Sequence, residues 1–316
     1  MQDVCSTMEK FGRTKIDTIL HCMQETSFHP HDFGRSVIPR VLFSGTLVSA
    51  ADFRCRAGAG IETIERFSAA HHLVFTRAGT FRRGGAWASS VVDPTQVLFL
   101  GPGEECHVRH SVAAGHDCTT FAYSPEALAT NAFQTTHLDQ AMVSPEALLG
   151  YHALRAMALQ QTQCPSAIHA LEEEAIALLA LLLEQRTETG SAKHPRAFTR
   201  HRDMVEGIKS ILAERPGDEH GLLDLAATFA VSPSQIAHVF RSVTGIPVHR
   251  YLLSLRMAAA LEQLSGGQRD LSRLALDLGF TSHSHFTATF RKWFGVRPSA
   301  VRMRLLQPKS VRRAYQ

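Results

Sequence analysis

The C-terminal third of the chain repeats one helical pattern twice, and this repeat constrains the fold more than any other feature of the sequence. Each repeat holds two short segments whose apolar residues recur at i, i+3, i+4 and i+7, or at i, i+4 and i+7 in the last, aromatic segment, which is the spacing of one face of an α-helix. These residues are Leu222, Leu225, Ala226, Phe229, Ile236, Val239, Phe240 and Val243, then Leu271, Leu274, Ala275, Leu278, Phe286, Phe290 and Trp293. Two short helices joined by a tight turn predict a helix-turn-helix, whose second helix can enter the major groove of DNA.

A long helix is expected over residues 248–264, between the two repeats. A helix of this length spans about 25 Å, which suits two major-groove faces about 34 Å apart once the flanking helices are added. Each repeat ends in a Gly followed by a Pro, Gly245/Pro247 and Gly295/Pro298. A plain helical bundle is the alternative. The duplicated turn and ending instead favour two tandem helix-turn-helix units that read successive grooves.

The charge of the chain is unevenly distributed. From residue 197 to the end there are 17 Lys and Arg against 9 Asp and Glu, whereas the preceding 196 residues have 16 basic and 20 acidic side chains. A basic C-terminal third is the sign expected where a protein meets phosphate. We therefore expect double-stranded DNA as the partner of the two repeats.

The second helix of each repeat has a polar face opposite its apolar face. Ser232 can cap the first of these helices, with Pro233 at its first position and Gln235 completing a capping box, and Ser282 can cap the second. Small polar side chains and histidines suit base edges, and basic ones suit phosphates. The predicted DNA-binding residues are Ser234, Gln235, Ala237, His238, Arg241, Ser282, His283, Ser284, His285, Thr287, Ala288, Arg291 and Lys292.

Specific predictions can be made for four further residues of this region. Gly279 suits a left-handed turn residue between the two helices of the second repeat, and Ala230, at the equivalent position of the first, must meet that geometry another way. Arg256 of the connecting helix is expected either near the DNA backbone or in solvent, as is Arg250.

Residues from about 36 to 124 have the pattern of β-structure. Short apolar runs such as VLFSGTLVSA, HHLVFTRAG, TQVLFLGPGE and CTTFAYS alternate with turn signals at Asp93-Pro94 and Gly101-Pro102-Gly103. Short strands at this spacing predict a small barrel or sandwich. The expected fold is therefore multi-domain, with an N-terminal β barrel and trailing helices before an all-α C-terminal bundle.

The trailing helices are predicted from their start signals and periodicity. Ser124-Pro125-Glu126 and Ser144-Pro145-Glu146 each offer a capping Ser, a Pro at the first helical position and an acidic first turn. A helix over residues 166–186 carries an apolar stripe on an acidic background. Its residues are Ile168, Leu171, Ala175, Leu178 and Leu182. The stripe is either a dimerisation seam or packs against the barrel of its own domain.

Cysteine and histidine usage bears on chemistry and compartment. The six cysteines are scattered without CxxC or zinc-finger spacing, which favours reduced thiols in the cytoplasm, and the start of the chain lacks a signal-peptide core. The β region is dense in potential ligands, at His71, His72, Cys106, His107, His110, His116 and Cys118. Strand alternation places Cys106 and His110 on one face and His107 on the other. We expect ordinary core or surface histidines and buried inert thiols rather than a bound metal or a redox sensor. No nucleophile, base or phosphate loop is evident, so an enzyme is not expected.

Both halves resemble a known family. LLDLAATFAVSPSQIAHVFRSVTGIPVHRYLLSLRMAAALEQL and LSRLALDLGFTSHSHFTATFRKWFGVRPSAVR resemble the paired helix-turn-helix domain of AraC/XylS-type transcription regulators. That resemblance implies base contacts from positions 234, 237, 238, 283, 284, 287 and 288. Family members often carry Arg or Gln where Ala237 and Ala288 stand, so these alanines would contact thymine methyls or leave readout to DNA shape. DPTQVLFLGPGEECHVRHSVAAGHDCTTFAYSP resembles, more loosely, the cupin-like sensor domain of these regulators, and implies a ligand or partner pocket inside a small barrel.

Taken together, the sequence predicts a cytoplasmic, sequence-specific DNA-binding transcription regulator of the AraC type, an activator by that resemblance. The expected parts are an N-terminal arm (1–35), a cupin-like sensor and dimerisation domain (36–186), a linker (187–199), a tandem helix-turn-helix domain (200–306) and a basic tail (307–316). Expected partners besides DNA are RNA polymerase, a small-molecule effector of unknown site and a second copy of the chain. No cofactor, catalytic residue, metal ligand or membrane is expected. Two alternatives stay open: a cupin metalloenzyme carrying a DNA-binding domain, and a DNA-binding protein controlled through the 166–186 helix by a protein partner.

Overall fold

The computed structural model describes residues 37–56, 60, 62–84, 90–110, 115–128, 139–160, 164–188 and 199–306. The predicted arm (1–35) and basic tail (307–316) lie outside these residues, as does most of the predicted linker. At the linker's two ends, α4 (Pro165–Glu188) extends to residue 188 and α5 (Thr199–Glu214) begins at residue 199.

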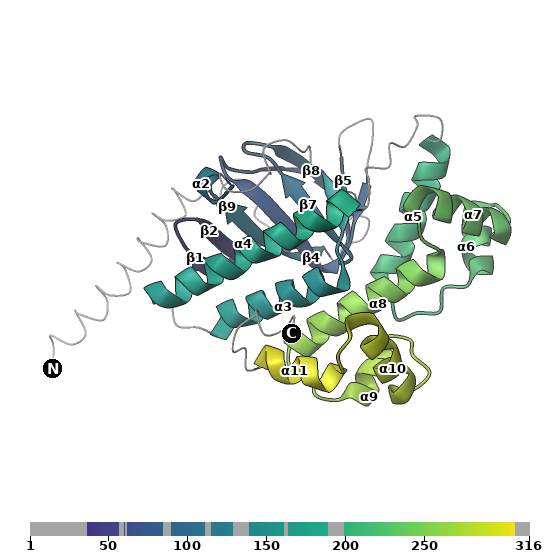
Figure 1. The fold of residues 1–316 in the computed structure, drawn as a ribbon. Coiled ribbons are helices and arrows are strands. Elements are labelled where there is room, and N and C mark those ends of the chain that lie inside the picture. Colours follow the sequence, from purple (N-terminus) through teal and green to yellow (C-terminus); the bar gives the residue numbers. More distant parts are fainter. Residues whose placement is uncertain are drawn as a thin grey trace, which may run out of the picture.

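The N-terminal half contains two antiparallel sheets (Figure 1). The larger has the order β1-β2-β9-β4-β7-β10 and comprises β1 (Val37–Ser44), β2 (Val48–Cys55), β9 (His116–Tyr123), β4 (His71–Gly79), β7 (Gln96–Leu100) and β10 (Gln140–Met142). The smaller has the order β3-β8-β5-β6 and comprises β3 (Glu62–Arg66), β8 (Glu105–Arg109), β5 (Phe81–Arg83) and β6 (Ser90–Val92). Among the described strands, no hydrogen-bonded ladder joins the two sheets into a closed barrel. The coarse prediction of N-terminal β-structure is confirmed.

The inner faces of the two sheets share one apolar core. This core includes Phe53, Val74 and Leu98 from the larger sheet and Phe81 and Val108 from the smaller. The predicted runs form strands, with one refinement. VLFSGTLVSA covers parts of both β1 and β2, because a turn at residues 45–47 separates them. The turns at Asp93 and Gly101 are confirmed by backbone hydrogen bonds from residues 96 and 104.

Two helices cover the outer face of the larger sheet, α3 (Pro145–Gln160) and α4. Both serine caps are confirmed, since the hydroxyls of Ser124 and Ser144 accept hydrogen bonds from the amides of residues 127 and 147; Ser124 begins the short α2 (Pro125–Leu128). The buried Glu172 of α4 accepts hydrogen bonds at 2.6 and 3.1 Å from the amides of Leu47 and Val48, which ties α4 to the β1–β2 turn.

The apolar stripe of α4 packs inside its own chain. Its central residues, Leu171, Ala175, Leu178 and Leu182, are buried in the core beneath the larger sheet. The spacing of these residues therefore reflects packing of α4 against its own domain. The alternative interpretation of the same stripe as a dimer seam is wrong because these side chains are already covered.

The C-terminal half consists of seven described helices. The first unit contains α5, α6 (Leu222–Phe229) and α7 (Pro233–Thr244), and the second contains α9 (Leu271–Asp277), α10 (His283–Phe294) and α11 (Pro298–Leu306). Between them runs α8 (Val248–Ser265), the predicted connecting helix. The first unit has its own core around Phe240 and Tyr251. The second shares one continuous core with α3, α4 and the larger sheet. None of the described helices is long and apolar enough to cross a membrane.

Candidate nucleic-acid interface

The first candidate recognition helix is α7. The Ser232 hydroxyl caps it by accepting a hydrogen bond from the Gln235 amide at 3.2 Å, and Pro233 occupies its first turn, as predicted. Ile236, Val239 and Phe240 are buried in the core of the first unit. The opposite face is open: Ser234, Gln235, His238 and Arg241 are exposed and Ala237 is half-buried. The helix therefore presents polar side chains and one cation to solvent.

The second candidate recognition helix is α10. Ser282 caps it through the amide of His285 at 3.1 Å, so its hydroxyl is engaged with the helix itself. A ladder of aromatic rings, Phe280, Phe286, Phe290 and Phe294, fixes its buried side. The other predicted residues lie outside. His283, Ser284, His285, Ala288, Arg291 and Lys292 are exposed and Thr287 is half-buried.

Two hydrogen bonds orient histidines on this outer face. The Thr287 hydroxyl and a ring nitrogen of His283 are 3.4 Å apart, one helical turn from each other. The hydroxyl of Thr281 lies 3.1 Å from Nδ1 of His285. These contacts hold the two rings at the start of α10, the end of a recognition helix that contacts base edges.

The turn inside each unit has the same left-handed backbone. In the second unit Gly279 has φ 72°, as predicted. In the first unit Ala230 has φ 51° and ψ 47°, and it is the one non-glycine residue with positive φ among the described residues. The amide after each of them, at residues 231 and 280, donates to a carbonyl five residues earlier. Ala230 thus adopts the glycine-like conformation directly, and the expectation that it meets the geometry another way is wrong.

The half-buried side chain of Arg256 is held by three backbone carbonyls of its own chain. Its guanidinium donates to the carbonyls of Pro216 and Gly279 at 2.8 and 3.1 Å, and to that of Asp218 at 3.1 Å. The residue links the loop after α5 to the turn of the second unit. Arg250, in contrast, is exposed and lies over the ring of Trp293 at 5.7 Å, a cation–π contact between α8 and α10.

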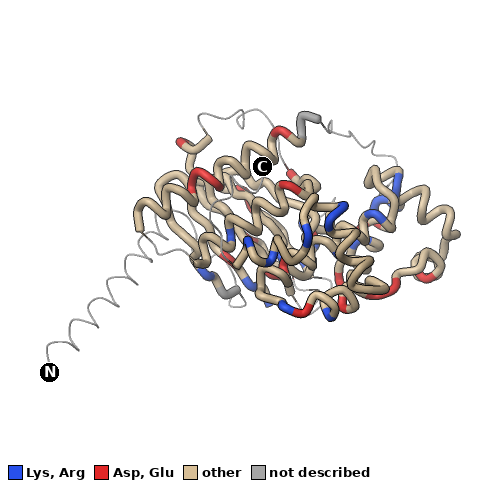
Figure 2. The backbone as a smooth tube through the Cα atoms, turned by 60° about the horizontal axis from the view of Figure 1, so that its bottom comes forward, with Lys and Arg blue, Asp and Glu red and all other residues tan. Residues whose placement is uncertain are grey.

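The basic residues of the C-terminal half are interspersed with acidic ones along the backbone (Figure 2). Several of the acidic side chains make a helix cap or an ion pair within this half. Asp270 caps α9 through the amides of residues 272 and 273, and Asp277 pairs with Arg273 at 2.9 Å. The cations that remain exposed on the recognition helices are Arg241, Arg291 and Lys292.

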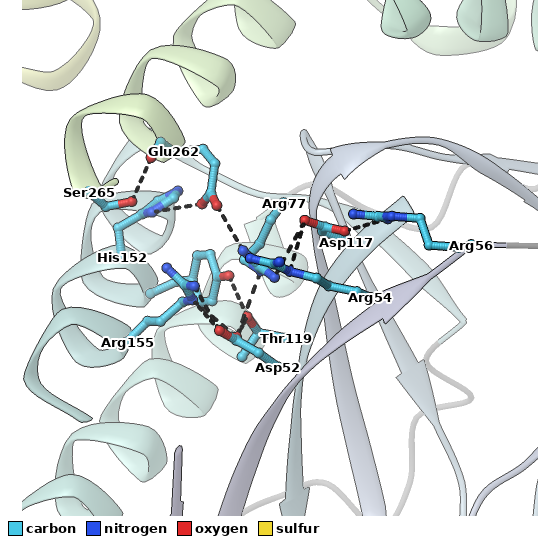
Figure 3. Close-up of polar contacts among 11 residues, drawn as sticks. Asp52, Arg54, Arg56, Arg77, Asp117, Thr119, His152, Arg155, Glu262 and Ser265 are labelled. Atoms are coloured by element: carbon cyan, nitrogen blue, oxygen red, sulfur yellow. Dashed lines mark hydrogen bonds and ion pairs between the residues drawn. The ribbon is translucent and has the colours of Figure 1, made fainter. Parts of the chain in front are cut away.

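A buried ion network joins the two halves of the chain (Figure 3). The carboxylate of Asp52 in β2 accepts hydrogen bonds from Nε and Nη2 of Arg155 in α3, and from the Thr119 hydroxyl at 2.6 Å. These contacts lower the pKa of Asp52 against the opposing effect of burial. Arg77 of β4 lies 3.7 Å from the same carboxylate. The cluster therefore anchors α3 on the larger sheet through charges withdrawn from water.

From this network a hydrogen bond reaches the C-terminal half. Nη1 of Arg77 donates to Oε1 of Glu262 on α8 at 2.8 Å. His152 of α3 lies 3.9 Å from the other Glu262 oxygen, but burial lowers the pKa of His152 to about 3, so its ring is neutral. Sequence reasoning missed Glu262 and Arg77 because 185 residues separate them.

Two further contacts cross between the halves. The Tyr251 hydroxyl of α8 hydrogen-bonds Asp93, in the turn before β7. On α5, a carboxylate oxygen of Glu206 accepts from the Val91 amide at 2.5 Å, and Lys209 pairs with Glu206 at 3.0 Å. Both α5 and α8, which support the first unit, are thus bound to β6 or its neighbouring turn.

The core between the two sheets contains a small cavity of about 20 Å³. Phe53, Phe67 and Val74 supply part of its apolar wall, and Glu65, Cys118 and other polar groups also line it. Its volume is about that needed for a single water molecule. Burial raises the pKa of Cys106 to about 12 and also raises the pKa of Cys118 well above its usual value, which agrees with the expectation of inert thiols. The cavity lies within the predicted sensor region.

Comparison with known proteins identifies the C-terminal domain. Residues 225–304 match a family described as "Helix-turn-helix domain". The chain is 30% identical over 129 residues to the arabinose operon regulatory protein of Escherichia coli (strain K12), covering 40% of this chain and 43% of that protein. It is 26% identical over 212 residues to the HTH-type transcriptional activator RhaR of Yersinia pseudotuberculosis serotype O:1b (strain IP 31758), covering 63% and 71%. The matched segment spans about two fifths of the arabinose regulator's length.

A similarity in structure covers more of the chain, but its TM-score is low. The structure of ToxT from Vibrio cholerae superposes with a TM-score of 0.33 at 10% identity, covering 86% of this chain and all of that one. The resemblance of the C-terminal half to the helix-turn-helix domain of AraC-type regulators is confirmed by the sequence relatives.

Proposed function

We propose that this chain, which carries an AraC-type helix-turn-helix domain, is a transcription regulator that binds double-stranded DNA through α7 and α10. The observation that carries the proposal is the pair of capped helices with buried apolar and exposed polar faces, joined by a continuous helix of 18 residues. Such a pair suits two successive major grooves on one side of a duplex. The names of the relatives point to transcriptional control.

Within this proposal, base and phosphate contacts are divided between the exposed residues. Base-edge contacts are assigned to positions 234, 237 and 238 of α7 and 283, 284, 287 and 288 of α10. Arg241, Arg291 and Lys292 contact phosphates, because their long cationic side chains extend from the ends of the two helices. Ser282 contributes chiefly by capping α10, since its hydroxyl is already bonded there.

The N-terminal half is proposed to be a cupin-like sensor domain that controls DNA binding. Support comes from its two facing sheets and the contacts it makes with α5 and α8. These contacts fix the helix that sets the spacing of the two units. A signal at the sensor domain, a small effector or a second copy of the chain, would shift the population of arrangements that fit DNA. Recruitment of RNA polymerase and a cytoplasmic location follow as parts of the same proposal.

The DNA-binding assignment is tested by selecting duplexes from a random pool with the full-length protein, over a series of salt concentrations. The proposal expects a motif with two short blocks about one helical turn apart. Replacing His283 with Ala should relax preference at one or two base pairs, at a cost of roughly 1–3 kcal/mol. Replacing Lys292 with Ala should weaken all sequences about equally and lower the salt slope by about one.

A matched control is Arg40→Ala, which removes an exposed cation from β1, on the sensor half. It should leave both affinity and motif unchanged. If the three variants behave alike, the division of base and phosphate contacts is wrong. If full-length protein selects no motif with or without added effector candidates, the DNA-binding function itself fails.

The control exerted by the sensor half is tested at Glu262. Changing it to Gln removes the charge that faces Arg77 and weakens the hold of the sensor half on α8. We expect the variant to bind a selected duplex several-fold more tightly than the parent chain. Asp203→Asn, an exposed change of equal charge on α5, controls for the general gain of positive charge. Equal effects of the two changes would exclude a specific role for the Arg77–Glu262 contact.

A further inference from the structure

Three potential metal ligands meet at one end of the space between the two sheets. Cys55 ends β2, His116 begins β9, and the two are direct partners in the antiparallel register. His110 follows β8 of the other sheet. One ligating atom of each residue lies within 4.8 Å of those of the other two, and all three residues are buried, with exposed fractions of 4%, 4% and 1% for Cys55, His116 and His110.

Glycine backbone packing fixes the position of two of these ligands. Gly115 precedes His116 with φ +70°, and a Cβ there would come within 1.9 Å of the Cys55 carbonyl oxygen. Gly79 is equally restricted, because its Cβ would meet the Gly115 carbonyl oxygen at 2.4 Å. The backbones that carry Cys55 and His116 are thus in direct contact, and no residue larger than glycine fits at position 115.

The two imidazoles are close enough to share one ion. Nε2 of His110 and Nδ1 of His116 lie 2.7 Å apart, with the rings nearly stacked at 21°. Two nitrogens bound to one tetrahedral ion lie about 3.3 Å apart, given nitrogen–metal distances of about 2.0–2.1 Å. The two nitrogens therefore need to separate by about 0.6 Å to bind one cation.

The hydrogen bond between the rings does not satisfy the site. Nδ1 of His110 is buried and has no hydrogen-bond partner among the residues that the structure describes. An imidazole that binds an ion through Nε2 carries its proton on Nδ1, so this atom lies beside such an ion and is not one of its ligands. The small cavity described above is lined by Cys55 and His116, and its volume leaves room for a water as an additional ligand.

We propose that Cys55, His110 and His116 form a binding site for a thiolate- and imidazole-preferring transition-metal ion of the zinc type. A thiolate with two imidazoles suits such ions, whereas the carboxylate and carbonyl oxygens that Mg²⁺ and Ca²⁺ prefer do not dominate here. Sequence reasoning expected no metal. It considered His110 and His116 but not Cys55, which only the pairing of β2 with β9 brings to them.

The site is independent of the proposed DNA-binding function and can be tested without DNA. Untagged full-length protein is stripped with a chelator under reducing conditions and titrated with Zn²⁺ against a competing chromophoric chelator, and with Co²⁺ followed by absorption. We expect one equivalent of each ion and a cobalt–thiolate charge-transfer band. Cys55→Ser should abolish that band and lower zinc affinity roughly 100-fold or more, by comparison with the 10–100-fold typical of losing an outer-shell partner.

The matched control is Cys164→Ser, which changes an exposed cysteine at the start of α4. It should keep the stoichiometry, affinity and band of the parent chain. His110→Gln provides a second ligand variant outside the strands, so that the site remains testable if Cys55→Ser does not fold, as judged by circular dichroism. The proposal is overturned if the parent chain binds no ion, if His110→Gln retains full zinc affinity, or if the thiolate band is lost in Cys164→Ser rather than Cys55→Ser.

Discussion

The left-handed alanine in the first helix-turn-helix unit predicts a stabilising substitution. A left-handed backbone costs an L-residue with a Cβ roughly 1–2 kcal/mol, and Ala230 adopts that backbone at φ 51°. Changing Ala230 to Gly removes this cost. Glycine loses more conformational freedom on folding than alanine does, and this loss offsets roughly 0.5–1 kcal/mol of the gain. The net expectation is that Ala230→Gly raises the free energy of unfolding by about 0.5–1 kcal/mol.

The second unit supplies the reverse experiment. Gly279 has the same backbone, and a Cβ there would lie 2.3 Å from the Gly217 carbonyl oxygen and 2.7 Å from the Arg256 guanidinium. Gly279→Ala therefore adds steric overlap, worth about 1–3 kcal/mol, to the backbone cost. We expect it to lower the free energy of unfolding by about 2–4 kcal/mol.

The assay is urea unfolding of the full chain, followed by circular dichroism and compared at a common urea concentration near the midpoints. Ala227→Gly is the matched control, because it makes the same change three residues earlier inside α6, at an exposed position. There glycine should destabilise by about 1 kcal/mol. If Ala230→Gly destabilises as much as Ala227→Gly, Ala230 does not adopt the left-handed conformation and the reasoning is refuted.

Three other perturbations have defined outcomes. Lowering the pH from 7 to 5 should reduce the free energy of unfolding, because burial lowers the pKa of His72 and His152 to about 3 and their unfolded rings take up protons near pH 6.5. Glu65 opposes this loss of stability, because burial raises its pKa to about 7 and the folded protein holds a proton that the unfolded chain has lost. Glu65→Gln should therefore steepen the pH dependence of the free energy of unfolding between pH 5 and 6 by up to about 1.4 kcal/mol per pH unit. An unchanged slope in urea titrations would show that this carboxyl is hydrated. Glu172→Ala leaves the amides of Leu47 and Val48 without their acceptor, and thermal unfolding should show a loss of about 1–3 kcal/mol, whereas the exposed Glu173→Ala should be within about 0.5 kcal/mol of the parent. In Arg256→Lys a single ammonium group cannot bond the three carbonyls that the guanidinium holds. This variant should lower the stability of the domain measurably in the same assay. Arg250→Lys, where the arginine contacts only one aromatic face, should have a smaller effect.

Local signals made the recognition helices predictable. The caps at Ser232 and Ser282 and the buried positions of α7 and α10 depend on residues within one or two helical turns, so periodicity and capping chemistry locate them. The connecting helix was predicted within one residue of its end for the same reason. Ala230 lay beyond such reasoning, because residue type argues against the left-handed backbone that the duplicated turn requires.

Contacts between distant segments could not be predicted from spacing. Alternation predicted that Cys106 and His110 share a strand face; both are buried, but β8 ends at Arg109 and His110 follows it. Nothing local pairs that face with Cys55 or brings Arg77 to Glu262, because sheet register and domain packing decide both. The stripe of α4 shows the converse limit: an apolar seam has the same spacing whether it meets a second chain or its own sheet, and only the fold shows that it meets the sheet.

The boundary between cores does not follow the boundary between sequence domains. Met257, Leu261 and Leu264 of α8 belong to the same core as α3, α4 and the larger sheet, whereas Tyr251 and Leu255, earlier in the same helix, belong to the first unit. A chimera that grafts residues 197–316 onto a foreign N-terminal domain would uncover the face of α8 that meets α3 and β4 unless the new partner offers a matching apolar face. Replacement of the N-terminal half is therefore constrained at α8, which lies inside the residues 225–304 that match the helix-turn-helix family.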